Sequence, residues 1–278
     1  MCSINDSLVE VYAFVDDFLV AHPTLSGWRR SPNSHPAFTD AEVITLGLMQ
    51  NVLGVATLKQ TYRLIANNWR SAFPHLCCYA RWLTRLQALT PLMGRLIQEA
   101  IRHHNLPGCL YLLDSKPIPV CKPIRHGRVR LLREEGAYFG KNSVGWFFGF
   151  KLHTLVHHTG AILYAMLTPA NCSDKDADVL QTLLPLAAGG AVLVDLGYQD
   201  KELLAQIERE YDVQAINPSQ AGGRRALISS LRERIETTFS GLWSRFVDRV
   251  FSRSWIGLWV AVLLKMLHYN LTLAGTIR

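Results

Sequence analysis

The sequence predicts a mixed α/β fold preceded by an all-helical region. Up to about residue 105, apolar residues recur at the spacing of amphipathic helices, and from residue 109 short aliphatic and β-branched runs replace them. Two of these runs, 110–113 and 191–194, lead directly into Asp114 and Asp195. Because an unpaired carboxylate is costly to bury, both aspartates are expected to have partners at the end of a buried strand.

Five helices are predicted in residues 1–105. They cover residues 4–22, 40–54 and 57–69, a segment from residue 79, and a segment from 91 to 104. Thr39 and Glu42 have the spacing of a capping box at the start of the second helix. Arginines lie between aromatic positions at Arg63, Arg70, Arg81 and Arg85. They indicate a region that binds DNA or positions a substrate, and the alternative is the solvated face of an ordinary helical bundle.

From residue 109 the chain alternates strands and helices. Strands are predicted at 109–114, 146–156 and 161–168, with a turn at Gly160, and then at 191–195 and 213–216. Helices are predicted from a cap at Ser173, over 200–210, over 225–246 and over the apolar stretch 255–275. Three antiparallel strands followed by alternating helices and strands is the element order of the ribonuclease-H-like fold, a mixed sheet with flanking helices. The chain is therefore expected to divide into residues 1–105, 106–254 and 255–278, the last a helix packed on the α/β domain.

The composition favours a globular protein with an anionic partner. The chain has 278 residues, 49% of them hydrophobic, a net charge of +7 and an isoelectric point near 9.2, which favours a polyanion or an anionic membrane surface. Its six cysteines form no CxxC pair, so reduced cytoplasmic thiols are expected rather than a zinc site or a disulfide framework. No secretory signal is visible at the N-terminus.

The apolar stretch from Trp255 to Gly275 could be read as a membrane span. Lys265, His268 and Asn270 interrupt it, and a charge with two polar groups near mid-span is costly in lipid. A buried amphipathic helix is the preferred interpretation.

Asp114 and Asp195 suggest a divalent-metal site, because hard cations take oxygen ligands from a few carboxylates. A third carboxylate is expected from the helix at 225–246. Glu236 stands beside Ile235 at the edge of the apolar stripe of that helix. Glu233 is the competing candidate, and pairing with a neighbouring arginine would explain it without a catalytic role.

These residues carry a resemblance to a known family. The segments LLDSKPIPV, VLVDLGYQD and RERIETTFSGL resemble the DDE triad of bacterial insertion-sequence transposases, closest to the insertion-sequence 982 family. The three acidic residues follow one another at intervals of 81 and 41 residues. The N-terminal segments FTDAEVITLGLMQ and TYRLIANNWRSAFP are also similar to the leading helical region of that family.

The resemblance implies a DNA transposase with a ribonuclease-H-like DDE catalytic domain. Asp114, Asp195 and Glu236 would be the catalytic residues and the ligands of two Mg²⁺ ions, which Mn²⁺ can replace. The implied reaction is cleavage at the element ends and transfer of the freed 3′-hydroxyl into target DNA. The implied partner is double-stranded DNA, both the terminal inverted repeats and the target DNA. The chain is also expected to form a homo-oligomer on that DNA. No membrane is expected, and the location would be cytoplasmic and nucleoid-associated.

Two other functions stay open at this point. One is a ribonuclease-H-like nuclease that hydrolyses DNA without strand transfer. The other is a catalytically inert DNA-binding derivative.

A basic segment follows Asp114. Residues 116–151 contain eight lysines and arginines against Glu134 and Glu135. The predicted DNA contacts are Lys116, Lys122, Arg125, Arg128, Arg130, Arg133 and Lys141, together with Arg232 near Glu236. The alternatives are a solvated basic loop and, for Arg232, an ion pair with Glu236 or Glu233.

His153 and His157 have metal-ligand spacing only on a helix, and this segment is predicted as a strand, so no metal is expected there.

Overall fold

The computed structural model divides the chain into two compact units, each described here by itself. The helical unit comprises residues 1–104 and 251–278, and the α/β unit comprises residues 105–250. The structure describes residues 3–26, 36–104, 106, 108–128, 130–142, 145–173, 176–194, 200–216, 233, 237, 240 and 252–277.

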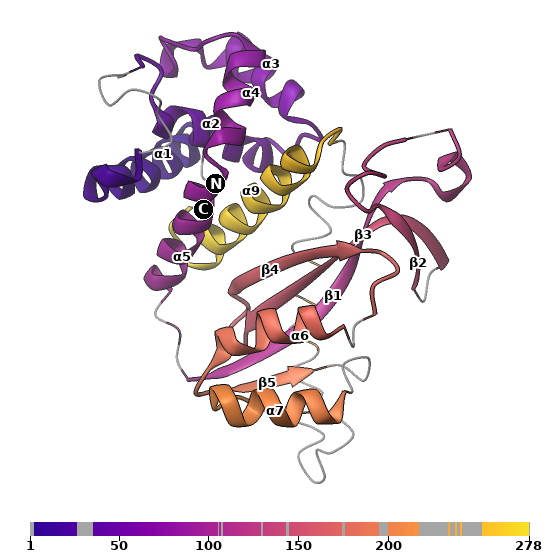
Figure 1. Ribbon diagram of the computed structural model, residues 1–278. Coiled ribbons are helices and arrows are strands. Elements are labelled where there is room, and N and C mark those ends of the chain that lie inside the picture. Colours follow the sequence, from indigo (N-terminus) through magenta and orange to yellow (C-terminus); the bar gives the residue numbers. More distant parts are fainter. Residues whose placement is uncertain are drawn as a thin grey trace. The chain divides into compact units, whose positions relative to one another are not determined.

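The helical unit contains the five helices predicted near the N-terminus and the apolar helix near the C-terminus. Its α-helices are α1 (Ile4–Ala21), α2 (Asp40–Val52), α3 (Leu58–Asn68), α4 (Tyr79–Ala88), α5 (Thr90–His103) and α9 (Trp255–Leu273), with short 3-10 turns η1 (Pro23–Ser26) and η2 (Arg70–Ala72). The capping box at the start of α2 is confirmed, because the Thr39 hydroxyl accepts from Glu42 N–H and the Glu42 carboxylate accepts from Thr39 N–H. α2 is buried along nearly its whole length and packs against α1, α3, α4 and α9 (Figure 1).

The apolar helix α9 packs within the helical unit, most extensively against α5 and also against α2 and α4. Asn51 Nδ2 on α2 donates to the Leu264 carbonyl of α9 (3.1 Å). These contacts lie within the helical unit, and the expectation that the helix packs on the α/β domain stays a prediction. A helix that is apolar on most of its faces can be buried against any apolar neighbour, so its sequence does not select one. By length and composition alone α9 could cross a membrane, but 56% of the 18-residue apolar stretch in this helix is buried inside the protein.

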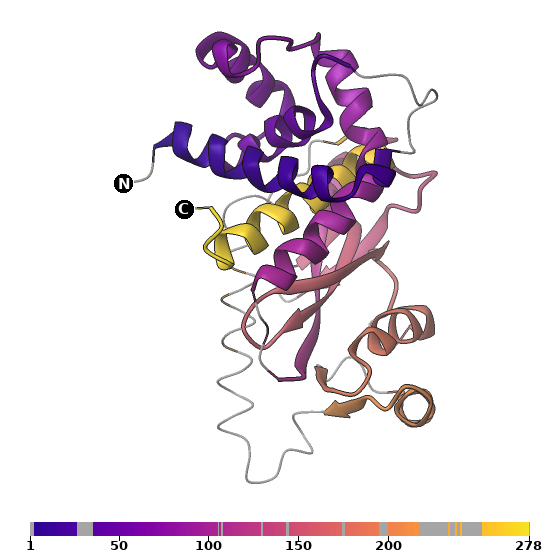
Figure 2. The same cartoon turned by 90° about the vertical axis from the view of Figure 1, so that its left-hand side faces the viewer.

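The α/β unit is built on one mixed six-stranded sheet. Its strands are β1 (Leu110–Cys121), β2 (Tyr138–Asn142), β3 (Gly145–His157), β4 (Ile162–Pro169), β5 (Ala191–Val194) and β6 (Gln214–Ile216). β3 pairs antiparallel with β1, β2 and β4, whereas β5 is parallel to both β1 and β6. The helices α6 (Ala177–Leu183) and α7 (Lys201–Tyr211) both lie on the same face of this sheet (Figures 1 and 2). The predicted α/β class is confirmed, and the strand order is consistent with a ribonuclease-H-like sheet.

Three details differ from the prediction. β1 continues to Cys121 instead of ending at Asp114, and β2 was not predicted. The N-cap of α6 is Asp176, whose carboxylate accepts from Asp178 N–H (3.0 Å), rather than Ser173. Aspartate and serine are both good N-caps, so composition alone does not choose between them.

A bulge bends the long β1–β3 ladder between Pro119 and Cys121. Gly149 lies opposite Pro119 with a φ of +158°, and a Cβ added there would lie 2.1 Å from the Ile118 carbonyl oxygen. Only glycine lets the two backbones approach so closely.

Candidate active site around Asp114

Asp114 lies in the central strand of the α/β unit, directly opposite Thr154 of β3. Its Oδ1 accepts a hydrogen bond from Ser115 N–H (2.7 Å), and its Oδ2 lies 3.9 Å from Lys116 Nζ. The Asp114 side chain is 29% exposed, so solvent and ligands reach it. Partly exposed carboxylate oxygens are the ligands that hard divalent cations prefer, and the chemistry of Asp114 therefore fits a metal ligand.

The parallel pairing of β1 with β5 relates Asp114 to Asp195. Leu110 pairs with Ala191, and the register continues to Leu113 and Val194. Val194 is the last residue of β5, and Asp195, the next residue in the chain, lies outside the described residues. In the sequence, Asp114 comes directly after Leu113 and Asp195 directly after Val194, and these two preceding residues pair with each other. In open α/β sheets, ligands bind beyond the carboxyl ends of parallel strands such as β5.

Two prolines, Pro117 and Pro119, follow Asp114 in β1. The Cys109 carbonyl accepts from Ala191 N–H next to β5, whereas the Leu110 carbonyl accepts from His158 N–H next to β3. Backbone groups alternate along a strand, so Pro117 and Pro119 share the orientation of Cys109. Proline has no N–H to donate, and within the described residues β5 pairs with β1 only up to Leu113. On this edge of β1 beyond Asp114, Pro117 and Pro119 therefore supply no donor, and the Ser115 N–H donates to Asp114 Oδ1.

The third predicted ligand, Glu236, and the predicted phosphate contact Arg232 lie outside the described residues. Around them the structure describes Glu233, Thr237 and Ser240, all helical and exposed. The Thr237 hydroxyl donates to the Glu233 carbonyl (2.8 Å). Their spacing of four and three residues is that of one helix face, so Glu233 belongs to an exposed face.

Among the residues that the structure describes, no group of three or more His, Cys, Asp or Glu could hold a metal ion. Two of the three predicted ligands are outside that set. The pair His153 and His157 lies on β3, as predicted, and both imidazoles have other partners. His153 Nε2 lies 2.9 Å from Thr168 Oγ1, and His157 Nδ1 lies 2.9 Å from Thr159 Oγ1.

The cations of the basic segment are mostly exposed. Lys116 is half-buried beside Asp114, and the exposed ones are Lys122, Arg125, Arg128, Arg130, Arg133 and Lys141. Part of the segment packs on the sheet, because the His126 ring contacts Phe139 of β2 with a centroid distance of 4.6 Å. Arg133 donates to the His126 carbonyl and lies over the Phe148 ring (5.9 Å). These contacts place exposed positive charge beside β2 and β3.

Of the four arginines noted in the helical region, Arg85 has a structural role. It pairs with Asp40 (2.7 Å) at the start of α2 and donates to the Phe38 carbonyl, and its side chain is only 13% exposed. Arg63, Arg70 and Arg81 are exposed. The interpretation as a DNA-binding face therefore no longer extends to Arg85.

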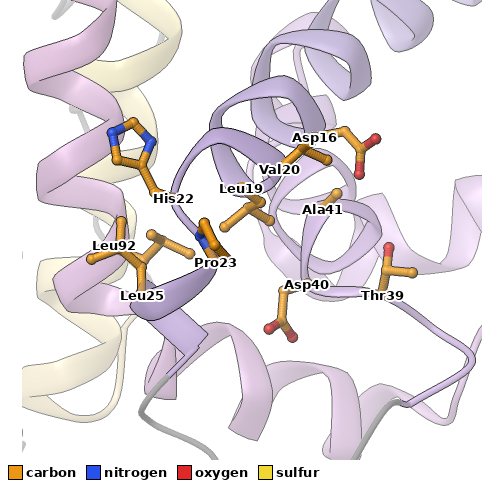
Figure 3. A pocket seen from close by; sticks show the side chains of 10 residues that line it. All are labelled: Asp16, Leu19, Val20, His22, Pro23, Leu25, Thr39, Asp40, Ala41 and Leu92. Atoms are coloured by element: carbon orange, nitrogen blue, oxygen red, sulfur yellow. The ribbon is translucent and has the colours of Figure 1, made fainter.

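The helical unit also has a cavity of about 230 Å³ between the end of α1 and the start of α2 (Figure 3). It is lined by Asp16, Leu19, Val20, His22, Pro23, Leu25, Thr39, Asp40, Ala41 and Leu92. The polar groups at the start of α2 already serve the fold, Thr39 as a helix cap and Asp40 as the partner of Arg85.

Two residues of β3 were not singled out from the sequence. Thr154 lies opposite Asp114 and is fully buried, and no described residue is a hydrogen-bond partner of its hydroxyl. Trp146 is the second residue of the same strand and is 63% exposed. A signal for Trp146 was available, since it is an aromatic residue in a basic segment, and aromatic side chains beside a basic groove stack on bases of single-stranded nucleic acid.

Comparison with known proteins bears on the α/β unit. Residues 105–238 match the family described as the transposase DDE domain, which is just under half of the chain. The matched segment contains Asp114, Asp195 and Glu236. The match supports a DDE transposase, and hence an enzyme of the transposase kind. No match was found among curated proteins or among solved structures.

Proposed function

We propose that this protein is a DNA transposase that cuts the ends of its own element and joins the freed 3′-hydroxyl to target DNA. The observation that carries the proposal is the match over residues 105–238, which spans all three predicted carboxylates. The register that pairs Leu113 with Val194 supports it, because it relates the first two carboxylates through adjacent strands.

The proposed chemistry is in-line displacement at phosphorus. Asp114, Asp195 and Glu236 would hold two Mg²⁺ ions, or Mn²⁺ in their place. When bound, these ions would stabilise the attacking and leaving oxygens. The attacking group is water in cleavage and the DNA 3′-hydroxyl in strand transfer, so no serine or tyrosine nucleophile is required. Lys116, 3.9 Å from Asp114, would place a positive charge next to the reacting phosphate.

The exposed cations of the basic segment would hold the DNA backbone. Lys122, Arg125, Arg128, Arg130, Arg133 and Lys141 are exposed, as phosphate contacts must be. Such contacts position DNA without reading its sequence. The net charge of +7 is in keeping with this partner.

We also propose membership of the insertion-sequence 982 family, from the resemblance of the segments around the three carboxylates and near the N-terminus. It implies double-stranded terminal inverted repeats as the specific partner, an oligomer that brings two ends together, and a cytoplasmic, nucleoid-associated location. Terminal inverted repeats flanking the coding sequence in the genome would support this assignment.

The test is a strand-transfer reaction. A pre-cut duplex carrying the inverted repeat from the flanking DNA is incubated with supercoiled plasmid, the purified protein and Mg²⁺. Joined products are expected with the wild type and absent with Asp114→Asn. Nicking without joining would indicate a nuclease, and binding without nicking would indicate an inert DNA-binding protein.

A further inference from the structure

The β2–β3 hairpin of the α/β unit presents an aromatic row on one face. Lys141 pairs with Trp146, and Phe139 pairs with Phe148. Directly opposed residues and residues two apart along a strand share a face, so these four side chains lie on the same face. Phe148 is 3% exposed and Trp146 is 63% exposed. The row therefore runs from a buried end to an exposed end.

The two ends of this row have different neighbours. At the buried end, His126 packs edge-on against Phe139, and the Arg133 guanidinium lies over Phe148. At the exposed end, the Lys141 ammonium lies 5.8 Å from the centre of the Trp146 ring. Each end thus joins an aromatic ring to a cation.

The opposite face of the hairpin is packed against the unit around Gly140 and Phe147. A Cβ at Gly140 would lie 2.5 Å from the Ala170 carbonyl oxygen, and Phe147 on that face is 8% exposed. This packing fixes which face of the hairpin carries Trp146. A tryptophan that remains exposed on a fixed face forgoes a large gain from burial.

We propose that Trp146 stacks on an unstacked base of a DNA strand whose phosphates lie along the exposed cations of the basic segment. The choice of DNA rests on the proposed function. Charge complementarity favours it over an apolar partner, because Lys141 lies at the ring and exposed arginines precede the hairpin. The bases of an intact duplex are covered by their neighbours, so the site takes single-stranded or distorted DNA.

The length of β3 limits how far the stacked base lies from the phosphate held at Asp114. Eight residues separate Trp146 from Thr154, which lies opposite Asp114. At about 3.3 Å per residue the strand spans at most about 26 Å. DNA rises about 3.4 Å per nucleotide, so the stacked base lies within about eight nucleotides of the phosphate held at Asp114.

The experiment measures binding of a fluorescent 15-nucleotide single strand by anisotropy, in EDTA and over a range of salt concentrations. Trp146→Ala is expected to weaken binding roughly 5- to 150-fold, because stacking contributes that much per base. Its salt dependence should match the wild type, whereas Lys141→Ala should lower the slope by about 0.7. Tyr138→Ala is the matched control, since Tyr138 is 56% exposed on the opposite face of the same hairpin.

A second measurement locates the base. 2-Aminopurine is placed at successive positions in a single-stranded overhang of a duplex end, and quenching by the wild type but not by Trp146→Ala is expected within eight nucleotides of the junction. Equal affinity of Trp146→Ala and wild type, or an equal loss with Tyr138→Ala, would overturn the proposal. Because EDTA removes the metal, these results do not depend on cleavage. Tryptophan-dependent binding without any strand transfer in Mg²⁺ would count against the proposed function alone.

Discussion

Thr154 lies opposite Asp114 across the β1–β3 ladder, with its hydroxyl fully buried. Among the described residues, none is a hydrogen-bond partner of Thr154 Oγ1. Buried polar side-chain atoms without partners are uncommon in folded proteins. Thr154 is directly opposite the carboxylate that the proposed chemistry uses.

Replacing Thr154 by valine is expected to leave stability unchanged or to raise it by about 1 kcal/mol, because a methyl group takes the place of an unsatisfied hydroxyl. Thr168→Val is the matched control on the adjacent strand. The Thr168 hydroxyl lies 2.9 Å from His153 Nε2, and its loss should cost about 1 kcal/mol. Urea unfolding measures both, and an equal loss for the two variants would contradict the expectation.

Mg²⁺ is expected to stabilise the wild type but not Asp114→Asn. An ion that binds only the folded protein stabilises it by about 2.7 kcal/mol at a concentration 100 times its Kd. The melting temperature is measured with and without Mg²⁺. Glu135→Gln is the control, since Glu135 is an exposed acid elsewhere in the same unit. A Mg²⁺-dependent rise that persists in Asp114→Asn would exclude Asp114 as a ligand.

Gly149→Ala is expected to destabilise the α/β unit by about 3 kcal/mol or more. The new methyl group would lie 2.1 Å from the Ile118 carbonyl oxygen, so one of the two strands must shift. Gly127→Ala is the control, because nothing lies within 4 Å of its added Cβ. Similar urea midpoints for the two variants would show that the bulge can relax at little cost.

The stability of the helical unit is expected to rise with pH because of Lys265. Burial in α9 lowers the pKa of Lys265 from 10.5 to about 8. Below pH 8 the side chain is charged in both the folded and unfolded states. Between about pH 8 and 10.5 the unfolded chain binds more protons, so the free energy of unfolding rises, by about 3 kcal/mol over the whole range.

The comparison with Lys265→Met isolates this effect from other groups that titrate at high pH. The variant should lack the rise, whereas Lys59→Met, which removes an exposed lysine of the same unit, should retain it. Urea unfolding at pH 7.5, 9 and 10.5 gives the difference. A parallel pH dependence of wild type and Lys265→Met would show that the lysine stays charged when buried.

The strands that carry or precede the predicted aspartates could be predicted because their signal is local. An apolar run that ends on a charged residue marks a strand, and β1 and β5 start where the runs start. The run does not mark the end of β1, which continues to Cys121. The capping box at Thr39 and Glu42 is equally local, and it is confirmed. These features depend on residues within a few positions of one another.

The remaining features depend on contacts that the sequence does not contain. Pro117 and Pro119 argue against a strand, yet β1 continues through them, opposite Lys151 and Gly149 of β3. The partner of α9 and the exposure of Trp146 are set by tertiary packing. The choice between Glu233 and Glu236 has the same origin, since it depends on which face of a helix meets the sheet.

That choice can be made by comparing two substitutions. Glu236→Gln is expected to reduce Mg²⁺-dependent cleavage at the element end by 100-fold or more, roughly the loss seen when one group that stabilises a transition state is removed. Glu233→Gln should retain most of the activity. Glu233 lies on an exposed helix face with Thr237 and Ser240, and its backbone carbonyl accepts from the Thr237 hydroxyl, which the substitution leaves in place.

Binding of the uncut end in EDTA should be equal for both variants, so a difference in cleavage reports on chemistry rather than on folding. The reverse pattern, with Glu233→Gln inactive and Glu236→Gln active, would move the third ligand one helical turn toward the N-terminus.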